Sequence, residues 1–303
     1  MRNILSFLGI LFVCSTFIVS CSSKTKVSSM EITEQGDQIA QKAVIFTEKR
    51  PVISEEGKIV GYQFTIKNKV IAQEVLNEKG EVVSVEGELP NGLIKQYDAK
   101  GVLISENNYN AGKLEGVNKT FYSDGVTVET VKNYKNGLLE GKSFEYYENG
   151  NKKQEANYKN GLLNGTLKKY SMAETLLSSA NYVDGKLDGL YKELFVTGTP
   201  KKETEYYNGK KEGYSKEYYS SGILKSEYNY SQDKLEGDSH IYYEDGSINK
   251  IEKYKNNKLN GDTKIYSNNN SEFPLYIDTY VNGKKTMRRA FSSKGIQIFK
   301  VQY

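Results

Sequence analysis

Short runs of alternating apolar and polar residues follow one another along most of this chain. Each run spans about seven residues and mixes Tyr, Phe, Ile, Val and Thr with Lys and Glu, as strands do. Asn-Gly or Asp-Gly pairs separate the runs, for example Asn149-Gly150 and Asn160-Gly161. These pairs supply the positive φ angles that tight hairpin turns require. The pattern therefore predicts a succession of β-hairpins.

The turns recur with a fixed period. Counted from the glycine that follows each Asn-Gly-x-Leu-x phrase, successive units begin 24 or 25 residues apart. Because a single hairpin is marginal in water and stacked hairpins share one sheet, the period predicts an all-β, elongated single-sheet solenoid of stacked antiparallel β-hairpins. The repeat glycines that begin the units are Gly92, Gly116, Gly141, Gly165, Gly189, Gly213, Gly237 and Gly261.

Aromatic residues, mostly tyrosine, occupy two neighbouring positions of the unit. The fifth residue after the repeat glycine is aromatic in seven of the eight units, and in several units a tyrosine follows it directly. Neighbouring strand residues point to opposite faces, so each face receives a row of rings. The candidate binding stripe consists of Tyr97, Phe121, Tyr122, Tyr146, Tyr147, Tyr170, Tyr218, Tyr219, Tyr242, Tyr243 and Tyr266.

The turn that follows Tyr147 leaves the hairpin register open. A two-residue type I′ loop places Tyr158 opposite Gly141, where its ring can lie over a position without a side chain, and puts Lys152 on the face of Tyr147. A three-residue loop with a bulge shifts the register by one residue and moves Tyr146 to the face of Tyr158. The sequence is compatible with both.

The units at the two ends depart from the period. Residues 43–91 are expected to form degenerate N-terminal hairpins or a cap, residues 92–285 hold the eight repeats, and residues 286–303 predict a capping hairpin whose last strand closes the sheet. The strand-like runs of the N-terminal cap are Ala43–Thr47, Ile59–Ile66, Val70–Leu76 and Glu81–Glu86.

The first 20 residues have a different character. Met1-Arg2-Asn3 precedes an apolar run that is shorter than the roughly 20 residues needed to span a bilayer, which is typical of a signal peptide. The run ends in Ile18-Val19-Ser20-Cys21, which resembles the bacterial lipobox. This resemblance implies a lipoprotein signal peptide over residues 1–20, lipidation of Cys21 and a flexible tether over residues 21–42. We expect an exported protein, lipid-anchored to a bacterial membrane, at the outer membrane or the cell surface.

The composition excludes several classes of chemistry. Lys and Arg (42) barely exceed Asp and Glu (38) and both signs are interspersed, whereas nucleic-acid binding needs a concentrated basic stripe. The two cysteines lie within the first 21 residues and His240 is the single histidine, so no metal cluster is expected. The carboxylates recur at equivalent positions, whereas an active site breaks such symmetry. We therefore expect no enzyme activity, no cofactor and no nucleic-acid partner.

The unit from Gly141 to Gly165 follows the pattern G-x(4)-Y-Y-x-N/D-G-x(7)-Y-x-N/D-G-x-L-x-G. This pattern is similar to the MORN repeat, in particular to the bacterial variant found in proteins often described as antitoxin components. The resemblance extends from about Asn91 to Gly283. It implies stacked β-hairpins that serve as a scaffold for protein or membrane contact without catalysis. An antitoxin role fits poorly here, because the partner of a cytoplasmic toxin has no use for an export signal.

These observations favour a non-enzymatic, membrane-anchored, extracytoplasmic scaffold for protein-protein interaction, with an unknown protein partner at the cell surface. One alternative is a glycan or cell-wall-binding surface protein, although such aromatic repeats rely on Trp and this chain has none. Another is an antitoxin or immunity-type partner of a toxin. A third is anionic-lipid binding, weakened by interspersed Glu, through lysines at the third position: Lys95, Lys119, Lys168, Lys192, Lys216 and Lys264.

Overall fold

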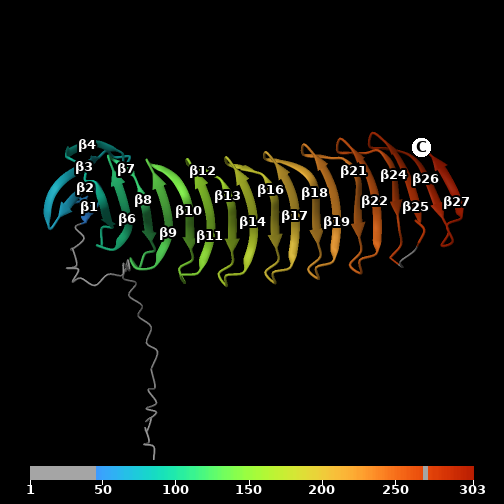
Figure 1. Ribbon diagram of the computed structural model, residues 1–303, viewed down its shortest axis with the longest axis horizontal. Coiled ribbons are helices and arrows are strands. Elements are labelled where there is room, and N and C mark those ends of the chain that lie inside the picture. Colours follow the sequence, from blue (N-terminus) through green and yellow to red (C-terminus); the bar gives the residue numbers. More distant parts are fainter. Residues whose placement is uncertain (1–45, 269–271) are drawn as a thin grey trace, which may run out of the picture. The chain divides into compact units, whose positions relative to one another are not determined.

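The computed structural model describes residues 46–268 and 272–303, which belong to one compact unit. The predicted signal peptide, Cys21 and the tether, residues 1–42, lie outside the described residues. Within the described part every regular element is a β-strand, and 27 strands form one sheet (Figure 1). The predicted all-β, single-sheet arrangement of stacked hairpins is confirmed.

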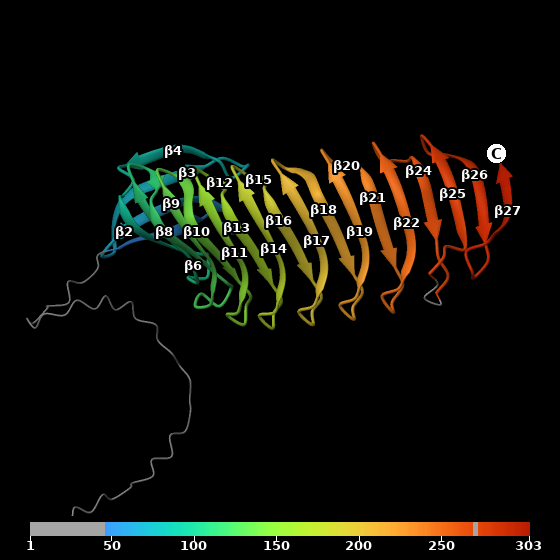
Figure 2. The same cartoon turned by 45° about the vertical axis from the view of Figure 1, so that its right-hand side comes forward.

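The unit that begins at Gly141 shows the common plan of the hairpins. Strand β10 (Leu138–Tyr146) pairs antiparallel with β11 (Lys152–Lys159), which in turn pairs with β12 (Leu162–Leu163) and β13 (Gly165–Tyr170) of the next unit. The sheet therefore grows by sequential neighbours in one row (Figures 1 and 2).

The other repeat strands follow this plan. Those before β10 are β5 (Gly92–Tyr97), β6 (Leu103–Asn110), β7 (Lys113–Leu114), β8 (Gly116–Phe121) and β9 (Val128–Lys135). Those after β13 are β14 (Leu176–Val183), β15 (Lys186–Leu187), β16 (Gly189–Leu194), β17 (Pro200–Tyr207), β18 (Lys210–Tyr218), β19 (Leu224–Ser231), β20 (Lys234–Leu235), β21 (Gly237–Tyr242), β22 (Ile248–Lys255), β23 (Lys258–Leu259), β24 (Gly261–Ile265) and β25 (Tyr276–Val281). The chain ends in the hairpin of β26 (Lys284–Phe291) and β27 (Gln297–Gln302).

The N-terminal strands differ from the repeats in order and direction. Strand β1 (Thr47–Ile53) pairs antiparallel with β2 (Ile59–Ile66) and parallel with β5, so the sheet begins at β4 (Val82–Gly87), beyond β3 (Lys69–Leu76). The parallel contact was not predicted. Of the predicted run Ala43–Thr47, the part up to residue 45 lies outside the described residues. Strand β1 begins where that run ends, because backbone pairing with β2 and β5 outweighs the polar sequence Glu-Lys-Arg-Pro.

The predicted positions of the other three N-terminal strands agree with the structure to within one residue at each end. A small apolar cluster forms where these strands meet the first repeat. Phe64, Ala72 and Ile94 are buried there, with Ile71 and Tyr109 packed against them. This cluster gives the N-terminal end of the sheet the aliphatic and aromatic packing that the polar repeats lack.

Elsewhere the covered side chains are mostly small. Eight of them occupy the second and fifteenth positions of the units and share one side of the sheet, which we call the small-residue face: Asn118, Ser143, Ala156, Ala180, Thr204, Ser215, Ser239 and Thr263. One sheet without a second layer encloses little volume, so only small side chains are fully covered. Close contact through Ser, Thr and Ala replaces a large aliphatic core in the repeats.

The turn after Tyr147 combines the two registers that the sequence left open. The Tyr147 N–H donates to the Asn151 carbonyl and the Gly150 N–H to the Tyr147 carbonyl, both at 2.8 Å, and Gly150 has a φ of 85°. This is the three-residue loop with a left-handed glycine. A second irregularity, between Glu145 and Tyr146, restores the other register over the rest of the hairpin.

Each expectation about the faces was therefore right in part. Tyr158 lies opposite Gly141, as the two-residue loop predicts, and Tyr146 does not join it. Lys152 pairs with Tyr146, and its ammonium lies 5.2 Å from the centre of the Phe144 ring. The prediction that Lys152 shares the face of Tyr147 was wrong, because the bulge turns Lys152 to the opposite side.

The repeat glycines have a backbone role that the sequence did not reveal. All eight have positive φ angles, for example 78° at Gly141 and 110° at Gly165. Seven of them lie where a two-residue strand such as β12 gives way to a longer one such as β13, or at the equivalent bend inside one continuous strand, and Gly92 begins β5. A residue with a Cβ is strained in this conformation, so the glycine is required whether or not a ring covers it.

Candidate interaction surfaces

The second aromatic of each pair connects one unit to the next. The hydroxyl of Tyr147 donates to the carbonyl of Tyr170 at 2.8 Å, in the following unit. The same bond, at 2.5, 2.9 and 3.0 Å, joins Tyr122 to Tyr146, Tyr219 to Tyr242 and Tyr243 to Tyr266. We call these four bonds the tyrosine ladder. These bonds indicate that the tyrosines of the second aromatic position stabilise the stacking of neighbouring units, since the hydroxyl of each ring is already bonded within the protein.

The first aromatic of each pair lies on the other side of the sheet, which we call the charged aromatic face. Lysines of the third position and glutamates of the fourteenth share this face, because they pair across strands: Lys95 with Glu106, Lys192 with Glu203 and Lys216 with Glu227. The rings there also contact neighbours of their own strand. Phe144 and Tyr146 have ring centres 6.4 Å apart, as do His240 and Tyr242.

Glutamates neutralise part of the positive charge on this face. The three Lys–Glu pairs are ion pairs with N–O distances of 2.9, 3.0 and 3.3 Å. Tyr218 lies beside them and donates to Glu203 at 3.2 Å. Burial, and after it the Glu203 carboxylate, raise the pKa of Tyr218 to about 12. Three of the six lysines considered for lipid binding are thus paired with glutamates, so this face presents tyrosine rings among charges of both signs.

All eleven residues of the predicted stripe are half-buried, but the structure does not bring them onto one surface. The seven residues of the first aromatic position lie on the charged aromatic face: Tyr97, Phe121, Tyr146, Tyr170, Tyr218, Tyr242 and Tyr266. The remaining four, at the second position, form the tyrosine ladder. The two predicted rows therefore lie on opposite faces. The first-position row remains available for contact with other molecules, whereas the second-position row connects the units.

Two further ladders, which sequence reasoning missed, join the units. Asparagines of the sixteenth position donate to carbonyls of the next unit, as from Asn157 to Thr166 at 3.3 Å and from Asn229 to Asp238 at 3.1 Å. The residue before the repeat glycine accepts the first N–H of the following type I′ turn, as Glu140 does from Asn160 at 2.9 Å. The sequence held this second signal, since all eight preceding residues are Asn, Asp or Glu.

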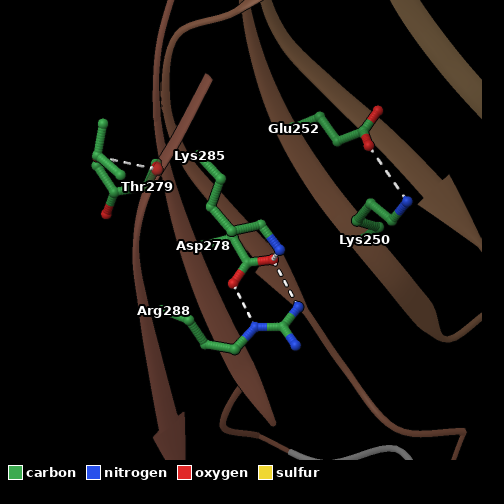
Figure 3. Close-up of polar contacts among 7 residues, drawn as sticks. Lys250, Glu252, Asp278, Thr279, Lys285 and Arg288 are labelled. Carbon is green, nitrogen blue, oxygen red and sulfur yellow. Dashed lines mark hydrogen bonds and ion pairs between the residues drawn. The ribbon is translucent and has the colours of Figure 1, made fainter. Parts of the chain in front are cut away.

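A cluster of buried carboxylates lies toward the C-terminal end of the small-residue face (Figure 3). Asp278, only 2% exposed, accepts two bonds from the Arg288 guanidinium, at 2.6 and 2.7 Å, and an ion pair from Lys285 at 2.8 Å. Arg288, and then Lys285, hold the pKa of Asp278 below its usual range. Glu252 is likewise buried, 3.2 Å from Lys250. With every carboxylate paired, the cluster is structural.

The described residues hold no group of three or more His, Cys, Asp and Glu side chains arranged to bind a metal ion. No helix in the described part of the chain is long and apolar enough to span a membrane.

Three segments of the chain match a known repeat family. Residues 90–111, 139–160 and 211–232 match the family described as MORN repeat variant. Curated proteins give no match. Among solved structures, the crystal structure of TcdB2-TccC3 is similar over 83% of this chain at 10% identity, with a TM-score of 0.18. The matched part is 16% of that chain, and a similarity this low carries no argument about fold or function.

Proposed function

We propose that this protein is a non-enzymatic scaffold that binds another protein through its charged aromatic face, held at the outer side of a bacterial membrane by an acylated Cys21. The matches to the MORN repeat variant support a protein-binding repeat. The choice of the charged aromatic face rests on the different contacts of the two tyrosine rows. One row has its hydroxyls bonded between units, whereas the other presents rings among paired charges.

Such a face suits protein recognition in its chemistry. Tyrosine provides apolar contact area with a polar tip and few torsions to restrict on binding. The alternating Lys and Glu side chains add positions for complementary charges, which contribute specificity more than affinity. Because glutamates neutralise three of the six third-position lysines, the attraction of this face to an anionic lipid surface is reduced.

Crosslinking in intact cells tests the proposal. We expect the full chain to capture a protein partner and a variant with Tyr146→Ser, Tyr170→Ser and Tyr242→Ser to lose at least nine-tenths of that capture. The matched control is Tyr303→Ser, which removes a tyrosine that is 68% exposed and lies beside Lys285, the partner of Asp278 on the opposite side of the sheet. Equal capture by both variants, with unchanged circular dichroism, would rule out the face as the binding surface.

The anchor is tested separately. Cys21→Ser should move the protein from the membrane fraction to the soluble fraction, and mass spectrometry of the unaltered protein should find acyl chains on Cys21. A protein that stays in the membrane fraction after this substitution would contradict lipid anchoring. It would leave the binding role of the charged aromatic face unaffected.

A further inference from the structure

The two outermost strands of the sheet, β4 and β27, each have one free edge. Among the described residues, β4 pairs with β3 alone and β27 with β26 alone. All six residues of each strand are exposed. The outward N–H and C=O groups of such a strand form a template for pairing with another strand.

Both edges are also apolar, which natural edge strands usually avoid. Val82, Val83 and Val85 of β4 are 50%, 59% and 44% exposed. In β27, Ile298 is 66% exposed, and Phe299 and Val301 are exposed as well. A strand laid against either edge would cover these side chains on both faces as well as satisfy the backbone groups.

The charges of the two edges are opposite. Residues 81–88 hold three acidic residues, Glu81, Glu86 and Glu88, and no basic one, whereas residues 294–303 hold Lys294 and Lys300 and no acidic side chain. Opposite charges placed across two strands are favourable and like charges are unfavourable. An antiparallel pair of two β27 strands centred on Lys300 would place the two ammonium groups together. Pairing of β27 with β4 brings lysines to glutamates.

We propose that β27 of one copy pairs with β4 of a second copy, so that the sheet continues from molecule to molecule. The contact is heterologous, because each copy contributes a different edge. Every added copy then leaves one β4 and one β27 free, and the assembly grows as an open chain rather than closing as a dimer. This self-association is independent of the charged aromatic face, which remains available in each copy.

Sedimentation velocity of the full chain tests the proposal, with Cys14→Ser and Cys21→Ser present throughout so that neither disulfides nor acyl chains join copies. The first variant adds Lys294→Glu and Lys300→Glu, and the second adds Glu86→Lys and Glu88→Lys. These four side chains are exposed and have no ion pair in the described structure. Circular dichroism confirms that each variant is folded.

We expect the unaltered edges to give sedimentation coefficients that rise with concentration. Each variant alone should associate at least tenfold more weakly, since its two edges then carry the same sign. An equimolar mixture of the two should recover association, because each variant's β27 is complementary to the other's β4.

Three outcomes would overturn the proposal. The first is a monomer at all concentrations with unaltered edges. The second is undiminished association of the Glu86→Lys, Glu88→Lys variant alone, which would indicate pairing of β27 with itself. The third is a monomer that associates only after deletion of residues 22–44, which would place that segment on an edge.

Discussion

The tyrosine ladder makes a stability prediction in which neighbouring residues serve as test and control. Tyr147→Phe keeps the ring and removes only the hydroxyl that donates to the Tyr170 carbonyl at 2.8 Å. A hydrogen bond of this kind contributes about 1 kcal/mol net, so we expect the free energy of unfolding to fall by that amount. Tyr146→Phe should change it by less than about 0.5 kcal/mol, because the Tyr146 hydroxyl makes no protein hydrogen bond in the described structure.

The four bonds of the ladder lie in different units, so their effects should be additive. Tyr→Phe at positions 122, 147, 219 and 243 together should lower the free energy of unfolding by about 4 kcal/mol. The ladder is interrupted naturally at Phe195, which occupies the second aromatic position without a hydroxyl. Phe195→Tyr should therefore restore a bond and raise the stability by about 0.5–1 kcal/mol.

Urea unfolding followed by circular dichroism measures these differences as shifts of the transition midpoint. Because repeat arrays can lose two-state behaviour, the slope of each transition must be compared as well. The reasoning is refuted if Tyr146→Phe costs as much as Tyr147→Phe, or if the fourfold variant unfolds at the midpoint of the unaltered protein.

Substitutions at three other positions test the turns and a buried carboxylate in the same urea assay. Glu174 takes the place of glycine in its turn with a φ of 60°, so Glu174→Gly should stabilise the protein by about 1 kcal/mol, and a loss of stability would contradict the strain. Glu140→Ala removes the acceptor of the Asn160 N–H and should cost about 1 kcal/mol, whereas Glu140→Gln should cost less. Asp278→Asn should cost about 3 kcal/mol at pH 7. As the pH falls below about 4, Asp278 is protonated in the unfolded chain before it is protonated in the folded protein, where its pKa is lower. The unaltered protein therefore loses this stability as the pH falls. The urea midpoint of the Asp278→Asn variant should depend less on pH.

The period and the turn residues could be predicted because both are local. Asn160-Gly161 and its equivalents specify turns by their own φ angles, and eight copies make the hairpin boundaries unambiguous. The opposition of Tyr158 and Gly141 follows from the same counting. Such features need no knowledge of what packs against the hairpin.

The bulge opposite Tyr146 and the parallel pairing of β1 with β5 could not be predicted in this way. A bulge shifts the register of the two strands by one residue, and the two registers differ little in free energy. The alternation of apolar and polar residues in the sequence is therefore compatible with both. Strand β1 contains Glu48, Lys49, Arg50 and Pro51, and its position depends on partners far along the chain. The sequence of β1 by itself gives no strand signal.

The functional division of the aromatic pairs depends on distances between units. Tyr146 and Tyr147 are identical in composition and adjacent in sequence, and only the position of the Tyr170 carbonyl distinguishes their roles. The acidic or amide residue before each repeat glycine, in contrast, was visible in the sequence. Its role as the acceptor of a turn N–H depends on the turn of the next unit, which lies beside it.

The sequential strand order has a consequence for the kinetics of folding. Hairpin partners such as Gly141 and Tyr158 are 17 residues apart, and the bond from Tyr147 to Tyr170 spans 23 residues. The parallel contact of Thr47 with Ile94 spans 47. Closing short loops costs little entropy, so the repeats should fold much faster than typical β-sandwiches, and docking of β1 against β5 should be the slow step.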